Sequence, residues 1–174
     1  VIDNITLTEQ PGGEFVFDST AFFPLDGKGF GNSGYSGYRN RNFGFTSVVR
    51  YWFEYNGNEN LTFRGDDDVW VFINKQLAVD LGGVHNPLQG SITLHASNGR
   101  GKTCPTCSYD INFGLEKGKV YEIVVFQAER HPSGSNYRLS RSDFTREYSV
   151  CSTVCGDGIR TYDEECDHGG QNGQ

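Results

Sequence analysis

The 174-residue chain contains no methionine, few leucines and alanines, and no long stretch in which apolar residues recur with the period of a helix. These absences argue against a helical protein. Glycine is abundant instead, with 23 residues, and aromatic side chains make up 14% of the chain. This balance is typical of short β-strands joined by glycine-rich turns. The composition therefore predicts a mostly β fold.

Other absences limit the classes of function. No apolar run approaches the roughly 20 residues that cross a bilayer, so we expect no direct membrane insertion. The net charge is −7 and the 15 basic residues are scattered rather than gathered in a stripe, so we expect no nucleic-acid partner. The chain also lacks a G-x-S-x-G elbow, a phosphate-binding glycine motif and an H-E-x-x-H motif. These three gaps argue against an enzyme.

Two features predict a secreted or cell-surface protein. Asn4 and Asn60 begin N-x-Thr sequons and would be glycosylation sites in a eukaryotic secreted chain. Five cysteines are present, three of them within residues 151–166. Each signal alone is weak, but together they favour an oxidising, extracellular environment.

Short segments with strand-like patterns recur along the chain, separated by turn signals about every 8 to 12 residues. They are residues 2–8, 14–17, 46–55, 61–64, 69–73, 77–81, 91–95, 109–113, 120–128 and 137–141. Such spacing predicts an all-β fold, an antiparallel β-sandwich with long loops. The glycine- and asparagine-rich stretch 27–44 predicts one long irregular loop whose aromatic residues pack on the sandwich.

The sequence changes character near residue 149, where core-forming residues become sparse. We expect a β-sandwich ligand-binding domain over 1–148, followed by the start of a cysteine-rich, disulfide-stapled module over 149–174 with Cys151, Cys155 and Cys166. Because the total number of cysteines is odd, at least one lacks an internal partner, which predicts further domains in a longer chain.

Cys104 and Cys107 have the C-x-x-C spacing of a redox motif or of half a zinc site. No helix pattern follows them, and a set of two further zinc ligands at fixed spacing is missing. We therefore expect a small disulfide that closes a loop tip.

Three consecutive carboxylates, Asp66, Asp67 and Asp68, lead directly into the apolar run 69–73. Like charges repel, and Asp has a poor strand propensity, so protonation, basic partners or a hard cation should compensate them. Calcium takes 6 to 8 oxygen ligands, and two adjacent Asp side chains can share one ion. Spacing alone also allows a solvated loop that enters a strand.

A second loop would have to complete such a site, and residues 128–139 are the best candidate. Pro132 and Gly134 predict an irregular backbone there. The loop offers oxygen ligands from Ser133, Ser135 and Asn136.

The charged residues of this loop could have a scaffold role instead. Glu129, Arg130 and His131 could pair with Asp68, Asp80 or His85. His85, His131 and Glu129 could also mimic a two-His-one-carboxylate metal site, but hydrogen bonds that brace the acidic loop explain the histidines better.

Four sequence blocks closely resemble the fibro-slime branch of the protective-antigen-fourteen β-sandwich family. They are FFPLDGKGFGN (22–32), NFGFTS (42–47), FRGDDDVWVFINKQLAVDLGGVH (63–85) and VFQAERHPSGSNYRL (125–139), in the order that the family has. Many members are calcium-dependent carbohydrate-binding domains of surface adhesins, yeast flocculins among them, in which two successive Asp residues joined by a cis peptide hold the ion. The tail pattern CGDG…EECD also resembles cysteine-rich repeats of large extracellular proteins.

The resemblance implies that Asp66 and Asp67 hold calcium and that the loop 130–136 supplies the other ligands. The expected metal ligands are Asp66, Asp67, His131, Ser133 and Ser135. The expected ligand-binding residues are Asp66, Asp67, Arg130, His131, Ser133 and Asn136.

The expected function is that of a calcium-dependent lectin or adhesin domain. Its partners would be glycans or cell-surface and extracellular-matrix polysaccharide. The alternative is a non-catalytic structural or protein-interaction module of an extracellular assembly, which would use the same aspartates. Protein recognition through the aromatic loop 27–44 is a third possibility.

Overall fold

The computed structural model describes residues 4–32, 40–95, 98–104, 109–132 and 134–144. The predictions for Cys107, Ser133 and the cysteine-rich segment 149–174 concern residues outside these ranges, as does the predicted domain boundary. Within the described ranges the chain forms eleven strands and no helix. Accordingly, no helix of the described residues is long and apolar enough to cross a membrane.

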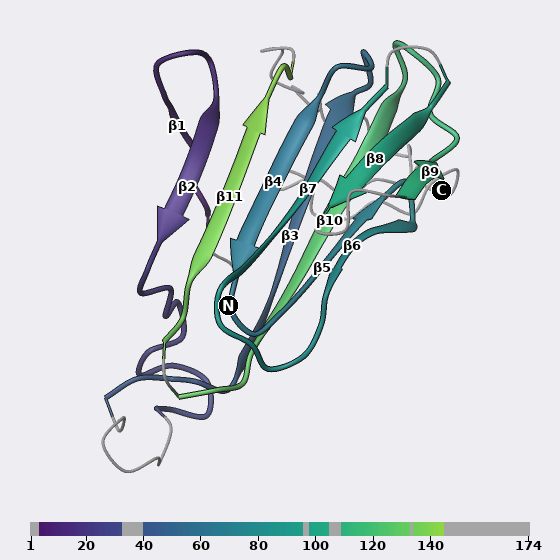
Figure 1. Cartoon of the computed structure of the whole chain (residues 1–174). Coiled ribbons are helices and arrows are strands. Elements are labelled where there is room, and N and C mark those ends of the chain that lie inside the picture. The colour runs from purple at the N-terminus through teal and green to yellow at the C-terminus, as the bar shows by residue number, and fades with distance from the viewer. Residues whose placement is uncertain (1–3, 33–39, 96–97, 105–108, 133, 145–174) are drawn as a thin grey trace, which may run out of the picture.

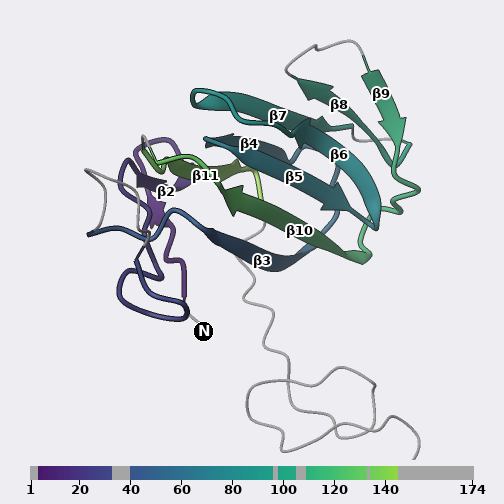
Figure 2. The ribbon, with the colours of Figure 1, turned by 90° about the horizontal axis from the view of Figure 1, so that it is seen from below.

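The strands form two antiparallel sheets that face each other (Figures 1 and 2). The larger sheet has the order β1 (Thr8–Glu9), β2 (Phe15–Ser19), β11 (Tyr137–Ser142), β4 (Asn60–Gly65), β7 (Leu88–Leu94), β8 (Arg100–Cys104) and β9 (Tyr109–Asn112). The smaller sheet has the order β3 (Phe45–Glu54), β10 (Val120–Glu129), β5 (Asp68–Ile73) and β6 (Gln76–Leu81). The predicted all-β antiparallel sandwich is confirmed.

Alternation along the strands builds the core between the sheets. In β5, Val69, Val71 and Ile73 are buried, whereas Trp70 and Phe72 lie half-buried on the outer face. The other strands contribute in the same two-residue period. Among the core residues are Phe53, Tyr55, Leu61, Phe63, Val79, Ile92, Leu94, Phe113, Ile123, Val125, Tyr137 and Leu139.

Two strands of the structure differ from those predicted from the sequence. In the described part of the expected strand over residues 2–8, only Thr8 pairs in a sheet, while Ile5 and Leu7 pack against the core without strand pairing. Strand β8 was missed because its sequence, RGKTC, shows no apolar alternation. It forms because β7 and β9 pair with it on both sides.

Strands β5 and β6, which match the expected segments 69–73 and 77–81, pair as a hairpin. Asn74 and Lys75 both have positive φ, 46° and 65°, as a two-residue turn matched to the strand twist requires. Asn tolerates this conformation, whereas Lys is strained there relative to Gly.

One end of the sandwich gathers the acidic triplet and its predicted partner loop, at the bottom of Figure 1. β4 ends and β5 begins there, and the register pairs Asp68 with Ala128 and Gly65 with Tyr137. The loop between β2 and β3 joins them, because the backbone N–H of Phe22 donates to the carbonyl of Ser135 at 3.0 Å. Residues far apart in the sequence thus form one surface.

Candidate functional site

Asp66 is held by Asn136, on the facing loop. Its Oδ2 accepts a hydrogen bond from Asn136 Nδ2 at 2.6 Å, and its Oδ1 accepts one from the backbone N–H of the same residue. Gly65 permits this close approach, because a Cβ there would lie 2.9 Å from Val69 Cγ2 and 3.2 Å from the Asn136 carbonyl oxygen. The predicted second loop therefore does face the acidic triplet.

Asp67 is the most buried member of the triplet. It is 2% exposed, and its Oδ2 accepts a hydrogen bond from the backbone N–H of Arg130 at 2.8 Å. A buried carboxylate is a strong acceptor for a cation or a donor.

Asp68 has a guanidinium partner. Arg130 donates to both of its oxygens, through Nη2 at 2.9 Å and through Nε, and the Gly83 N–H donates at 2.6 Å. Burial alone would raise the pKa of Asp68, but the Arg130 and Gly83 hydrogen bonds outweigh it and the pKa is lowered. Arg130 is thus a scaffold residue for Asp68.

The triplet is not a solvated loop. Asp66, Asp67 and Asp68 are 9%, 2% and 3% exposed. The alternative of a solvated loop, which the sequence spacing allowed, is wrong, because the β10–β11 loop covers the aspartates and hydrogen-bonds to each of them.

Arg130→Gln should lower the free energy of unfolding, because it leaves the buried charge of Asp68 without its partner. Since the pKa of Asp68 is lowered in the folded state, its contribution is present above its unfolded pKa and is lost as the pH falls through the folded value. The difference in free energy of unfolding between the wild type and Arg130→Gln should therefore become smaller in acid. Urea unfolding of both proteins at pH 7 and pH 3 measures this difference.

Arg64→Gln is the matched control for that variant, because Arg64 is an exposed arginine of the same end of the sandwich. It should change stability by less than about 0.5 kcal/mol. Equal effects of the two substitutions would contradict a structural role for the Arg130–Asp68 pair.

Glu129 adds a further carboxyl group to the site, which the sequence-based site lacked. It is 1% exposed, its Oε1 accepts a hydrogen bond from the His131 N–H at 3.2 Å, and its Oε2 has no partner. Burial raises its pKa to about 7, and the charges of Asp67 and Asp66 add to the effect. Alternation along β10 could have revealed it, because Ile123, Val125, Gln127 and Glu129 all face inward.

Glu59 shows how this protein satisfies a buried carboxylate that is purely structural. It is fully buried, and backbone N–H groups of Asn56, Gly57 and Asn58 donate to it, the last two at 2.9 and 3.2 Å. Glu129 is less well satisfied: hydrogen bonding from the Ser135 side chain and the His131 N–H lowers its pKa only in part, and among the described residues its Oε2 has no partner.

Two predicted residues of the second loop make contacts other than the expected ones to the aspartates. Ser135 is fully buried, and its hydroxyl donates to the Phe22 carbonyl at 2.7 Å. The His131 side chain is exposed, while its backbone N–H contacts Glu129. Their assignment as metal ligands remains a prediction.

His85 acts as a brace. Its Nε2 lies 2.9 Å from the Leu81 carbonyl and its Nδ1 lies 2.9 Å from the Asn86 carbonyl. The described residues contain no group of three or more His, Cys, Asp or Glu side chains placed to hold a metal. This finding argues against the two-His-one-carboxylate alternative.

A cleft of about 640 Å³ is lined by Glu129 of the acidic site, whereas the three aspartates are not part of its lining. The β2–β3 loop forms one wall with Phe30, Asn32 and Asn42, and the end of β10 forms the other with Glu129 and Arg130. Phe30 is fully exposed at its edge. The aromatic loop predicted to pack on the sandwich thus helps to shape an open site.

The donor chemistry fits a hard cation. Asp66, Asp67 and Glu129 offer only oxygen atoms, and one of these, Glu129 Oε2, is buried and unpaired. Since the described residues contain no group of three acidic or histidine side chains placed around one ion, further protein ligands would be amide or backbone oxygens, such as those of Asn136. The Asp66–Asp67 peptide is trans, like every peptide bond in the described ranges, in contrast to the cis bond that the resemblance implied.

The predicted glycosylation sites differ in their surroundings. Asn4 is exposed. Asn60 lies in β4, where its Nδ2 donates to the Asn58 carbonyl at 3.0 Å and to Asp143 Oδ2 at 3.3 Å, and its Oδ1 accepts from Thr93 at 2.8 Å. A glycan on Asn60 would displace part of this network.

Comparison with known proteins gives a family match. The model of the PA14 domain, the protective-antigen-fourteen family, matches residues 35–152. PA14 domains are modules of the carbohydrate-binding and adhesin type that occur in extracellular and cell-surface proteins. No solved structure matches the chain significantly.

Several proteins of Dictyostelium discoideum are similar in sequence. The chain is 37% identical over 164 residues to protein psiI, which is 88% of this chain and 20% of psiI. It is 36% identical over 151 residues to psiH and 33% over 159 residues to psiD, covering 19% and 28% of those proteins. It therefore spans between 19% and 28% of the length of these three relatives. Because the family model covers most of its length, including the acidic triplet and the facing loop, the chain belongs to the PA14 domain family.

Proposed function

We propose that the chain is a calcium-dependent carbohydrate-binding domain of a secreted or cell-surface protein. The observation that carries this proposal is the set of buried carboxylates Asp66, Asp67 and Glu129, of which Glu129 lines an open cleft and has an unpaired oxygen among the described residues. Donors that offer only oxygen atoms favour calcium over softer metals.

Asp66 and Asp67 would hold the ion, with Asn136 supplying an amide or backbone oxygen. When bound, calcium would supply positive charge and open positions for sugar hydroxyls. Arg130 neutralises Asp68 and, through its backbone N–H, orients Asp67. The arginine thus leaves the first two aspartates available.

The cleft supports a sugar ligand. Phe30 presents an exposed ring at its edge, and aromatic faces pack well against the apolar faces of sugars. Asn32 and Asn42 line the same cleft and offer amide groups for hydroxyl recognition. An open, small site of this kind should bind weakly per copy, so strong adhesion would need several copies.

A structural or protein-interaction module is the second candidate. Large apolar side chains on the outer face of the four-stranded sheet are exposed, among them Val48 and Trp52 of β3 and Phe126 of β10. Exposed apolar side chains on one sheet face can form part of an assembly surface, here with the Arg50–Glu122 ion pair among them. In that case calcium would only stiffen the acidic loop.

A glycan array in millimolar calcium, repeated with a chelator, separates the two candidates. We expect bound glycans in calcium and their loss with the chelator. Melting curves of the same samples report calcium binding independently. A calcium-induced rise in melting temperature with no bound glycan would support the assembly module, and the absence of both signals would contradict both uses of calcium.

A further inference from the structure

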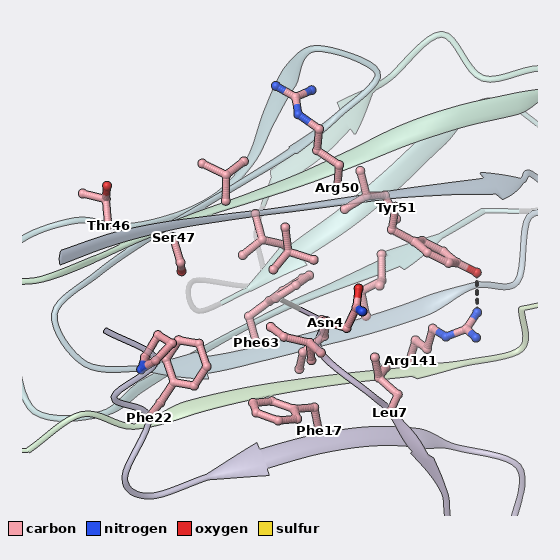
Figure 3. Close-up of a pocket in the computed structure, with 18 of the residues that line it drawn as sticks. Asn4, Leu7, Phe17, Phe22, Thr46, Ser47, Arg50, Tyr51, Phe63 and Arg141 are labelled. Atoms are coloured by element: carbon pink, nitrogen blue, oxygen red, sulfur yellow. Dashed lines mark hydrogen bonds between the residues drawn. The ribbon is translucent and has the colours of Figure 1, made fainter. Parts of the chain in front are cut away.

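A second cavity, of about 840 Å³, lies between the two sheets (Figure 3). Inward-facing apolar side chains from both sheets line it, among them Phe17, Val49, Phe63, Val125 and Leu139. Ile5 and Leu7 of the N-terminal segment lie along it. Among the described residues, Thr46 is the only one that lines both this cavity and the cleft at the acidic site, so the cavity and the cleft are distinct.

This space is too large to be a packing defect. Protein interiors are packed about as densely as organic crystals, and voids larger than a water molecule are few. Sites for small molecules typically occupy about 300 to 1,000 Å³ and are mostly apolar with a few polar groups. The cavity has the size and the lining of such a site.

A charged group stands at one end of the cavity. Arg141 of β11 and Tyr51 of β3 meet there, at the end opposite Phe22, and Arg141 Nη1 donates to the Tyr51 hydroxyl (Figure 3). The guanidinium carbon lies 4.8 Å from the centroid of the Tyr51 ring, 4.9 Å from Phe15 and 5.3 Å from Phe144. The three rings fix the plane of the guanidinium.

Arg141 has no anionic partner in the described part of the chain, and its buried Nε has no hydrogen-bond acceptor. Most of the other arginines there pair with a carboxylate: Arg41, Arg50, Arg100, Arg130 and Arg138. Arg50 also lines the cavity but is paired with Glu122 at 2.6 Å. The cavity therefore offers one unpaired cation at the end of an apolar chamber.

We propose that this cavity binds a long-chain carboxylate, with its head group on Arg141 and its hydrocarbon body between the sheets. A planar guanidinium matches a carboxylate with two parallel hydrogen bonds, and here Nε is buried without an acceptor among the described residues, so the head group would enter beside it. A single open cation favours a single anionic head, and the aliphatic and aromatic lining favours an unbranched hydrocarbon. This site uses none of the residues proposed to hold calcium or sugar.

Dodecanoate and the uncharged 1-dodecanol, both below their micellar concentrations, test the proposal on the whole chain by native mass spectrometry and calorimetry. A chelator in the buffer excludes calcium soaps and the acidic site. We expect one dodecanoate per chain, bound at least about tenfold more tightly than dodecanol because of the charged hydrogen bonds.

Three variants sharpen the test. Arg141→Gln should reduce dodecanoate binding to the level of dodecanol, Arg141→Lys should give an intermediate affinity, and Val125→Trp should abolish the binding of both by filling the cavity. Arg64→Gln, at an exposed arginine, should change nothing. A melting curve of each variant confirms folding. Absence of one-to-one binding, equal affinity for acid and alcohol, or an Arg141→Gln variant with wild-type preference would overturn the proposal.

Discussion

Asp67→Asn should abolish the rise in melting temperature that calcium gives to the wild-type domain. Calcium at a hundred times its dissociation constant stabilises a folded protein by about 2.7 kcal/mol, or roughly 5 to 10 °C for a chain of this size. The variant removes a negative charge that the proposed site uses but keeps an oxygen that can accept the Arg130 N–H. Without calcium it should be at least as stable as the wild type, because Asp67 repels Asp66 and Glu129.

Asp68→Asn is the matched control, since it removes an adjacent negative charge outside the proposed calcium shell. It should lower the melting temperature equally with and without calcium, because it weakens the pair with Arg130. A calcium increment retained by Asp67→Asn would contradict its proposed role as ligand. If both variants lose the calcium-induced rise in melting temperature, calcium binding depends on the net charge of the site and not on Asp66 and Asp67 specifically.

The strand pattern and the family blocks made the architecture and the position of the site predictable. Period-two alternation specifies which face of β5 and β10 is buried, and the resemblance located the facing loop. The polar strand β8 was not predicted, because its pairing with β7 and β9 stabilises it and its side chains show no apolar alternation.

The sequence did not predict that the three aspartates have different hydrogen-bond partners. Adjacent residues in a sequence look equivalent, but the start of β5 turns Asp68 toward the Arg130 guanidinium, while Asp66 and Asp67 meet the backbone of the β10–β11 loop. Such assignments depend on a few ångströms of tertiary geometry. Ser135 shows the same limit, because it has suitable chemistry but a side chain turned toward Phe22.

Without calcium, the free energy of unfolding of the wild type should contain a contribution from Glu129 that falls as the pH rises from about 4.5 to about 7. The pKa of Glu129 is raised from 4.5 to about 7 in the folded state, so over this interval the folded protein keeps a proton that the unfolded chain loses. The contribution is complete below 4.5 and is lost as the pH rises through 7. Its size is about 3 kcal/mol, at 1.36 kcal/mol per pH unit.

Glu129→Gln should remove this slope, because an amide does not titrate, and should make the calcium-free domain more stable than the wild type at pH 8. Urea unfolding at half-unit intervals from pH 4.5 to 8 measures both effects. Glu59→Gln serves as control: it replaces an oxygen that accepts backbone N–H groups, so it should destabilise the domain and leave the slope in place. If Glu129→Gln keeps the slope, its origin lies in other groups. If calcium flattens the slope in the wild type alone, the ion acts on Glu129 directly, because a nearby divalent cation favours the ionised carboxylate.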